Sequence, residues 1–434
     1  MKTIIEGGTI LPMDGDAPRL VMGDIGLDGS RIAFVGERPA GFVADRRVDA
    51  SGCIVMPGIV NAHTHIAMSL FRHYADDLPF WDWLFGRIVP AERKLTAGFV
   101  YDGSLLSAVE MIRGGVTCFA DMYFEMDAVA RATERAGLRA RLTRGLAFDG
   151  PKDLYKLDET RDFHAAWNGK AGGRISVDVG PHAVYTCAPE YLERSARVAL
   201  DLGSRLHLHL SESRKEVADC LAAYGKSPVA LARDSGAFEP PAYAAHCVHV
   251  SEADIAIMKE RGVAALHNPG SNMKLANGFA PVRAMLEAGL VVALGTDGSA
   301  SNNNLDMFEE MNLAAFAAKG STEDPTAVTA YQALRMATID GARALGLEAD
   351  IGSLEAGKKA DLILVDAGAP HFYPRNSACA ALVYAAQAAD VKTVFFDGAL
   401  LMEDRCLVHL DQAEICAKAQ ESARALTGSE GFVP

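Results

Sequence analysis

The sequence has no long apolar stretch, and its eight cysteines include no C-x-x-C pair. No run approaches the ~20 apolar residues of a membrane helix, which excludes a membrane-spanning protein. The first residues, MKTIIEGGTILPMDGD, have neither an apolar core nor a small-residue cleavage site, so they are not a secretory signal peptide. In a chain of 434 residues, such cysteines are typical of reduced thiols and not of a disulfide framework. We therefore expect a cytoplasmic protein.

Positive charge is also scarce. Lys and Arg number 42 against 56 Asp and Glu, which gives a formal net charge of -14. Proteins that bind nucleic acids or anionic membranes usually carry the opposite sign, so we expect neither partner. The acidity suits an enzyme that acts on small molecules, and it suits equally a surface that only has to stay soluble.

The composition is that of an ordinary globular protein, with 50% hydrophobic and 23% charged residues. A chain of 434 residues exceeds what one hydrophobic core usually organises, so we expect two structural units. Short β-branched runs broken by Gly, Asp and Pro occur at both ends, such as TIIEGGTIL and DVKTVFFDGALL. They predict a small β-sandwich built from residues 1–56 and 351–434, with a terminal helix.

Between these ends, eight apolar, strand-like runs alternate with helical segments such as DAVARATERAGL and SEADIAIMKERG. The runs are IVMPGIVNAHTH, GVTCFADM, ARLTRGLAF, RISVDVGPH, RLHLHLSE, AYAAHCVH, GVAALHNP and LVVALGTDG. Eight β/α units in series predict an α/β fold, a TIM-like (β/α)8 barrel over residues 57–350. The alternative, a doubly wound open sheet, lacks its G-x-G-x-x-G opening.

Polar residues close most of these runs, and several are histidines although the chain has only twelve. The strand-end residues are His63 and His65, His182, His209 with Glu212, His246, Asn268 and Asp297. Barrel enzymes form their active site at the C-terminal ends of the strands. We therefore expect these side chains to meet in one site, because core packing does not explain their recurrence.

The H-x-H pair of His63 and His65 points toward a metal. On an extended strand these two residues face the same side, so both imidazoles can bind one cation. Alone, the pair is equally typical of two solvated histidines. The metal site is favoured here because His209 and Asp297 lie at the ends of later strands. His207 alternates with His209; we expect it to be packed behind the ligands. Three imidazoles and one carboxylate suit one Zn²⁺ per subunit, and Fe²⁺ also fits.

A hydrolase of this kind needs a proton shuttle beside its metal, because the cation lowers the pKa of bound water toward ~7. Glu212 is the candidate general acid and base, although an acid here is also typical of a helix cap or a surface. Asp297 can accept a proton as well as bind metal. His246 is a candidate to orient the nucleophile and stabilise charge; a core histidine or a further ligand are the alternatives. We expect His249 to be structural.

These residues lie in segments that resemble the amidohydrolase superfamily, in its one-metal branch, and within it the 5′-methylthioadenosine/S-adenosylhomocysteine deaminases. The matching segments span most of the chain: PGIVNAHTHIAMSLFRHYADDLPFWDWL, GPHAVYTCAPE, HLHLSES, AAHCVH, HNPGSNMKLANG, LGTDGSASNNNLDMFEEM and IGSLEAGKKADLILVD. The H-x-H, HLSE and GTDG elements are specific for the superfamily. ADDLPFWDWL and SNNNLDMFEEM point to the adenosine-type deaminases, although the related triazine chlorohydrolases share much of this text.

The resemblance implies that His63, His65, His209 and Asp297 bind the metal. It also implies five substrate-binding side chains: Glu92 for the ribose hydroxyls, His182 near the ring or sugar, Trp83 against the purine, Arg144 for a substrate tail, and Ser301. From the sequence alone, Glu92 is one helix acid among many and Trp83 a core residue. The segment HAVYT keeps His182 but departs from the family's histidine-proline-tyrosine pattern, in a loop that helps to choose the substrate.

Together these features predict an enzyme that hydrolyses the C6 amino group of an adenine nucleoside, with Glu212 protonating N1. The expected substrates are 5′-methylthioadenosine and S-adenosylhomocysteine, with adenosine and 5′-deoxyadenosine as further candidates. One alternative is a deaminase of guanine, 8-oxoguanine or a pterin, or a triazine chlorohydrolase. A remote alternative is a binding protein that kept the barrel and lost the chemistry. The resemblance also implies a homo-oligomer, a dimer or tetramer.

Overall fold

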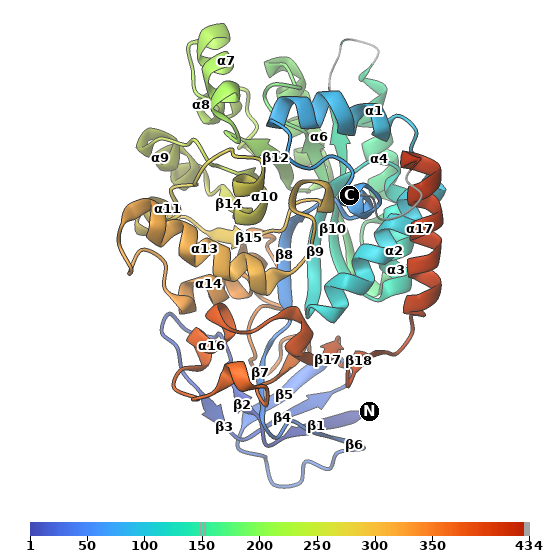
Figure 1. Ribbon diagram of the computed structural model, residues 1–434, viewed down its shortest axis with the longest axis vertical. Helices are drawn as coiled ribbons and strands as arrows, with labels where there is room; N and C mark the ends of the chain where they lie inside the picture. The colour runs from blue at the N-terminus through green and yellow to red at the C-terminus, as the bar shows by residue number, and fades with distance from the viewer. Residues whose placement is uncertain (148–149, 151–152, 429–434) are drawn as a thin grey trace.

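The structure is a computed structural model that describes residues 1–147, 150 and 153–428. Its centre is one parallel sheet whose eight strands follow the order of the sequence. The strands are β8 (Ile59–Thr64), β9 (Val116–Tyr123), β10 (Arg139–Leu146), β11 (Ile175–Pro181), β12 (Leu206–Leu210), β13 (Ala242–His246), β14 (Ala264–His267) and β15 (Val292–Leu294). A bridge between Thr64 and Asp297 brings the last strand back to the first. This confirms the predicted (β/α)8 barrel, which forms the upper part of Figure 1.

The eight apolar runs lie on these eight strands, and the reason is burial on both faces. Every residue of β8, β9, β12 and β13 is buried. Helices cover such strands outside and side chains fill the barrel inside, so their sequences are nearly continuous apolar runs. The first run is the longest because it also includes β7 (Cys53–Pro57), which belongs to a different sheet.

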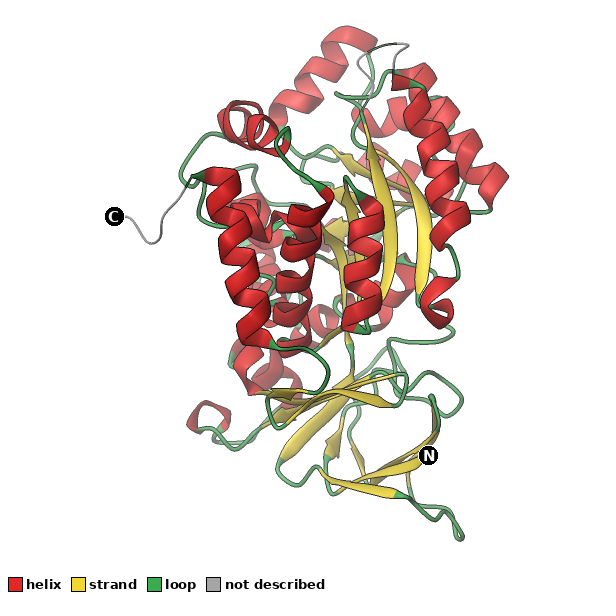
Figure 2. Cartoon of the chain, turned by 90° about the vertical axis from the view of Figure 1, so that its right-hand side faces the viewer, coloured by secondary structure: helices red, strands yellow, loops and turns green. Residues whose placement is uncertain are grey.

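Helices surround the barrel (Figure 2), and none in the described part of the chain is long and apolar enough to span a membrane. The helices after the early strands are η1 (Ile66–Phe71), η2 (Asp82–Ile88), α1 (Val89–Glu92), α2 (Ala97–Arg113), α3 (Met126–Ala136), α4 (Tyr155–Trp167), α5 (Lys170–Gly173) and α6 (Pro189–Leu202). Those after the later strands are α7 (Arg214–Tyr224), α8 (Pro228–Asp234), α9 (Glu252–Arg261), α10 (Pro269–Lys274), α11 (Val282–Glu287), α12 (Ser299–Asn302), α13 (Met307–Thr322), α14 (Ala330–Met336) and α15 (Ile339–Ala344).

Local sequence signals place the helix ends that return the chain to the barrel. α7 begins after Ser213 and α9 after Ser251, and each serine hydroxyl accepts a hydrogen bond from a backbone N–H of the first turn. α6 and α9 end at Gly203 and Gly262, where φ is +61° and +65°. Glycine adopts this left-handed conformation without steric cost, so the chain can reverse into the next strand.

Two sheets at the other end of the molecule are built from both chain ends, as predicted. A four-stranded sheet contains β5 (Arg31–Gly36), β4 (Asp24–Asp28), β1 (Lys2–Glu6) and β6 (Arg46–Asp49). A seven-stranded sheet contains β19 (Cys406–Leu407), β18 (Ala399–Glu403), β17 (Val391–Phe396), β16 (Leu362–Asp366), β7, β2 (Thr9–Ile10) and β3 (Val21–Met22). β7 and β16 pair antiparallel, which joins the two ends of the chain. The boundaries at residues 56 and 350 stay a prediction.

The C-terminal segment also contains helices. η4 (Pro370–Phe372), α16 (Ala378–Tyr384) and η5 (Ala388–Asp390) connect strands, and α17 (Gln412–Thr427) closes the described chain. α17 runs back along the barrel beside α2 (Figure 1), where Ser422 Oγ donates a hydrogen bond of 2.6 Å to Asp102 Oδ2. The terminal helix therefore contacts the barrel wall, while the strands before it complete the small β domain.

Candidate active site

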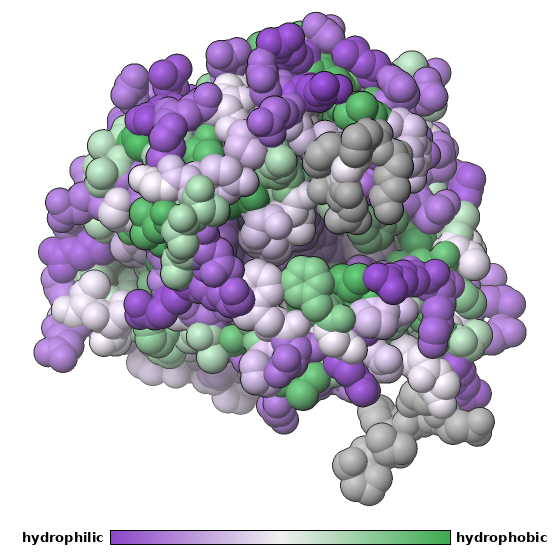
Figure 3. All heavy atoms as spheres, turned by 90° about the horizontal axis from the view of Figure 1, so that it is seen from above, coloured by the Kyte–Doolittle hydropathy of each residue, from purple (hydrophilic) through white to green (hydrophobic). Residues whose placement is uncertain are grey.

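A cavity of about 270 Å³ opens at the carboxyl ends of the barrel strands. Figure 3 views the molecule from this end, where the surface is hollowed near its centre. Eight predicted site residues line the cavity: His65, Trp83, Glu92, His182, His209, Glu212, His246 and Asp297. Most of these side chains lie at or just after the carboxyl ends of barrel strands, so they meet in one cavity although some are more than 200 residues apart in the sequence.

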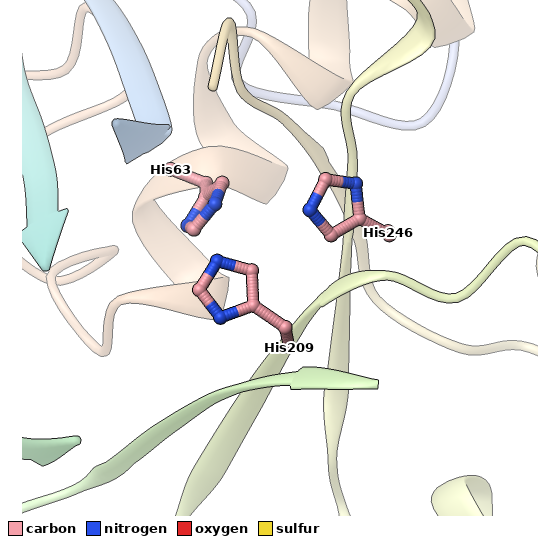
Figure 4. Close-up of side chains that lie close together, drawn as sticks. All are labelled: His63, His209 and His246. Atoms are coloured by element: carbon pink, nitrogen blue, oxygen red, sulfur yellow. The ribbon is translucent and has the colours of Figure 1, made fainter. Parts of the chain in front are cut away.

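The four predicted metal ligands form one cluster. Nε2 of His63 and of His65 lies 3.4 and 3.2 Å from Asp297 Oδ1. Nε2 of His209 lies 3.3 Å from His65 Nε2. His246 adjoins this cluster, because ring nitrogens of His63, His209 and His246 also lie within 4.8 Å of one another. Figure 4 shows these three imidazoles pointing toward a common space from β8, β12 and the end of β13.

The outer nitrogens of the same imidazoles already have partners. His65 Nδ1 donates to the carbonyl of Met122, and His209 Nδ1 donates to that of His182 at 2.9 Å. His63 Nδ1 lies 2.9 Å from Nε2 of His207, so His207 sits behind the cluster as predicted. Metal-binding histidines typically use one nitrogen in this way, which leaves the other aimed at the cation.

Asp297 is oriented by two serines. The hydroxyls of Ser271 and Ser301 each donate a hydrogen bond of 2.7 Å to Oδ2 of Asp297. Oδ1 is thereby left facing His63 and His65. Neither serine is among the described residues that line the cavity. Ser301 contacts a candidate ligand, and its substrate contact stays a prediction.

Burial sets the protonation of the cluster. It lowers the pKa of His63 to about 4 and that of His182 to about 3, and it lowers the pKa of His209 well below the usual range. These three rings are neutral near pH 7, as the proposed ligands His63 and His209 must be to bind a cation. Burial also lowers the pKa of His65, but the hydrogen bond and charge of Asp297 outweigh it and raise the value to about 9.

Glu212 is a buried acid at the edge of the cluster. Burial, with the negative charge of Asp297 adding to it, holds the pKa of its carboxyl well above the usual range. Oε1 accepts a hydrogen bond of 3.0 Å from Asn277 Nδ2 and lies 3.8 Å from His246 Nε2. Such a group can carry a proton at neutral pH, which general acid catalysis needs.

His246 and His182 form further walls of the cavity. Nδ1 of His246 lies 2.9 Å from the side-chain oxygen of Asn272, so in the neutral ring Nδ1 carries the proton and Nε2 is an acceptor. Nδ1 of His182 bonds the hydroxyl of Thr186 at 2.9 Å. His249, predicted to be structural, lies outside the cavity and bonds the backbone oxygen of Asn277 through Nε2 at 2.7 Å.

Of the other predicted substrate residues, Glu92 and Trp83 line the cavity and Arg144 does not. Glu92 Oε1 accepts a hydrogen bond of 2.8 Å from the hydroxyl of Tyr123, and burial raises the pKa of Glu92. Trp83 is buried, and its ring lies 6.0 Å from that of Phe80. Arg144 is turned away: its guanidinium bonds the carboxylate of Glu159 and the carbonyl of Gly145, and it does not line the cavity.

Supporting residues that were not anticipated include Tyr123, Ser271, Asn272 and Asn277. Tyr123 closes β9, so a strand-end search extended beyond histidines and acids would have found it. Ser271 and Asn272 lie in α10 and Asn277 after it, where no periodic pattern marks a side chain that faces the site. Their only signal is their presence in the segment HNPGSNMKLANG.

Comparisons with known proteins show the family to which the chain belongs. The sequence pattern of the amidohydrolase family matches residues 54–401. A 5-methylthioadenosine/S-adenosylhomocysteine deaminase of Thermoanaerobacter pseudethanolicus is 47% identical over 98% of this chain and 99% of its own. A 5′-deoxyadenosine deaminase of Methanosarcina mazei is 48% identical over 98% of each chain.

Solved structures show the same architecture. An adenosine deaminase from Xanthomonas campestris with bound zinc superposes with a TM-score of 0.93 at 36% identity, over 98% of this chain and 99% of its own. A zinc-complexed atrazine chlorohydrolase from Arthrobacter aurescens has a TM-score of 0.91 at 25% identity, over 97% and 100% of the two chains. The chain therefore belongs to the amidohydrolase family, alongside relatives named 5-methylthioadenosine/S-adenosylhomocysteine deaminases.

Proposed function

We propose that this protein is a metal-dependent hydrolase that deaminates adenine nucleosides to the inosine-type product and ammonia. One observation carries the proposal: the nitrogens of His63, His65 and His209 converge with Asp297 Oδ1 beside a cavity that also holds a buried acid, Glu212. The names of the relatives at 47% and 48% identity supply the substrate class, 5′-substituted or 5′-deoxy adenosines.

The residues present fit a divalent cation. Nε2 of His63 is buried without a hydrogen-bond partner, and the Nδ1 atoms of His63, His65 and His209 are already engaged. Three imidazoles and one carboxylate are a donor set for Zn²⁺, which we propose, and Fe²⁺ is the alternative. When bound, such a cation lowers the pKa of water toward ~7 and so supplies a nucleophile at neutral pH.

Glu212 is the proposed proton carrier. It takes one proton from the attacking water and delivers it to N1 of the purine while the water oxygen bonds to C6. The bond between C6 and the amino nitrogen then breaks, and the nitrogen leaves as ammonia after gaining the second proton of the water. The balance is nucleoside plus water to inosine-type nucleoside plus ammonia.

His246 is proposed to orient the attacking water. Because Nδ1 of the neutral ring donates to Asn272, Nε2 can accept a hydrogen bond from the attacking water. An acceptor there holds the water with one lone pair turned toward the substrate, which is a positioning effect. Asp297 is proposed to combine metal binding with acceptance of the second water proton.

Other residues that line the cavity are proposed to bind the sugar and the ring. Glu92 uses Oε1 for Tyr123, and its remaining lone pairs can accept hydrogen bonds from ribose hydroxyls. We propose that His182 contacts the substrate near the ring or sugar and that Trp83 offers its aromatic face to the purine. The substrate contacts of Arg144 and Ser301 stay predictions; in this structure their side chains bond Glu159 and Asp297.

The test is ammonia release from a panel of substrates by metal-analysed protein. The panel contains 5′-methylthioadenosine, S-adenosylhomocysteine, 5′-deoxyadenosine and adenosine, with guanine, 8-oxoguanine, a pterin and a triazine for comparison. We expect turnover of the nucleosides and little of the free heterocycles. If metal-replete protein leaves all four nucleosides unchanged but hydrolyses one of the others, the proposal is wrong. The homo-oligomer stays a prediction.

A further inference from the structure

The helix α10 and the loop that follows it contact both cavity residues to which we assign proton and water chemistry. Asn272, within α10, bonds His246 Nδ1 through its side-chain oxygen at 2.9 Å. Asn277, after α10, donates from Nδ2 to Glu212 Oε1 at 3.0 Å. A backbone hydrogen bond of 2.8 Å from Asn277 N to Asn272 O links the two positions. This short segment therefore contacts His246 at the end of β13 and Glu212 just after β12.

Asn277 is itself held firmly. It is only 7% exposed, and its backbone oxygen accepts a hydrogen bond of 2.7 Å from His249 Nε2. This gives His249 a purpose beyond packing: it fixes the backbone from which the Asn277 amide reaches Glu212. Gly278, with φ +119°, follows at once and lets the loop turn away toward α11.

Glu212 is fixed from its other side by Glu216. Glu216 is buried, and its two carboxylate oxygens accept hydrogen bonds from the backbone N–H groups of Ser211 at 3.0 Å and Glu212 at 2.7 Å. Ser211 has φ +51°, a strained conformation for serine that these bonds support. The backbone of Glu212 is thus held by Glu216, and its carboxyl group by Asn277.

We propose that Asn277 is a positioning residue that determines which oxygen of Glu212 carries the proton; this rests on the proposed function. The amide nitrogen of Asn277 can only donate, so Oε1 facing it must be an acceptor. Once the Glu212 carboxylate has taken a proton from water, that proton therefore resides on Oε2. Oε2 takes the proton from water and gives it to N1, while Oε1 remains bonded to Asn277 throughout.

The test compares Asn277→Asp and Asn277→Ala with the wild type. The aspartate keeps the size of the side chain but replaces the donor by an acceptor that faces Oε1. We expect kcat to fall about ten- to a hundredfold, the usual effect of losing a hydrogen bond to a charged group. KM should change less than about twofold, since Asn277 does not line the cavity. Metal content should stay close to wild type in the aspartate variant, whereas the thermal midpoint should fall, because the variant buries a second carboxyl group beside Glu212.

Asn312→Ala is the matched control. Asn312 donates from Nδ2 to the carbonyl of Val383 at 3.1 Å, a bond of the same kind that lies between α13 and α16. Its loss should leave kcat and KM unchanged. If folded, metal-loaded Asn277→Asp keeps the wild-type kcat, the proposal is wrong.

Crystal structures of the wild type and Asn277→Asp provide a readout independent of activity. We expect the Glu212 carboxylate to leave its wild-type position in the variant; an unchanged position would overturn the proposal. Should the wild type deaminate no nucleoside, the proposed function fails, and this comparison still decides whether Asn277 positions Glu212.

Discussion

At the scale of single residues, Glu212 is the side chain whose chemistry depends most on its surroundings, because burial keeps its pKa above the usual range. We expect Glu212→Gln to retain its metal, since the four proposed ligands are untouched. Its kcat should fall by about 10²–10⁴-fold, the usual contribution of a general acid or base. Glu193→Gln, an exposed change on α6, is the control. Steady-state kinetics with metal analysis decide, and wild-type kcat in Glu212→Gln would remove Glu212 from the mechanism.

Glu92 tests whether the cavity recognises a sugar. Glu92→Gln removes the negative charge that ribose hydroxyls would meet but keeps the size of the side chain. We expect kcat/KM for 5′-methylthioadenosine to fall about ten- to a hundredfold, mainly through KM, because a hydrogen bond to a charged group is lost. An unaltered kcat/KM for nucleosides would contradict ribose binding by Glu92 and favour a free-base substrate.

Residues on strands were more predictable than residues on loops. His63, His65, His209 and Asp297 close barrel strands, where regular geometry decides which side chains meet. Ser301 lies in α12, a single short turn. Its side chain is directed by a hydrogen bond to Asp297, and the sequence does not reveal this contact. Asn277 follows no periodic pattern at all. Loop residues are positioned by neighbours distant in sequence, so their roles emerged only from the structure.

At the scale of elements, the N-caps of α7 and α9 allow a matched comparison. The hydroxyls of Ser213 and Ser251 make the same kind of bond to the third residue of their helices. We expect Ser213→Ala and Ser251→Ala each to lower the free energy of unfolding by about 1 kcal/mol. Only Ser213→Ala should lower kcat, because Ser213 bonds the backbone of Glu216 beside Glu212. Thermal melts and kinetics on both variants check this, and equal effects on kcat would contradict it.

The barrel strands could be predicted because parallel strands buried on both faces appear as apolar runs. The pairing of the terminal strands could not: β7 and β16 are adjacent in one sheet although some 300 residues separate them, and no local pattern specifies the partner or the register. The contact of α17 with α2 was likewise invisible, because an amphipathic helix shows which face is buried but not what covers it.

At the scale of the whole molecule, a buried cation joins the barrel to the small β domain. Arg139 on β10 bonds Asp361 at 3.2 Å and Asp397 at 3.1 Å, both beside strands of the seven-stranded sheet. Removing one partner of a buried ion pair typically costs about 3–5 kcal/mol. We expect Arg139→Met to lower the free energy of unfolding by that amount at neutral pH, measured by urea denaturation. Asp361→Asn in the same protein should restore part of the loss.

The same pair predicts the pH dependence of that loss. Burial raises the pKa of Asp361 and Arg139 lowers it, so without Arg139 the folded pKa rises further. When the pKa of a buried carboxyl group is higher in the folded than in the unfolded protein, the protonated group costs the fold little. As the pH rises through the folded-state pKa, the group becomes charged and the fold loses stability. The deficit of Arg139→Met should therefore be smaller near pH 5 than near pH 8. Equal deficits at the two pH values would show that Asp361 is not the buried charge responsible.

The most direct test of a single-metal deaminase is a titration of metal-free protein with Zn²⁺ while ammonia release from 5′-methylthioadenosine is followed. The convergence of His63, His65, His209 and Asp297 predicts that the rate rises in proportion to bound metal and stops at one ion per chain. Full activity in metal-free protein, or no activity with one ion bound per chain, would contradict the account.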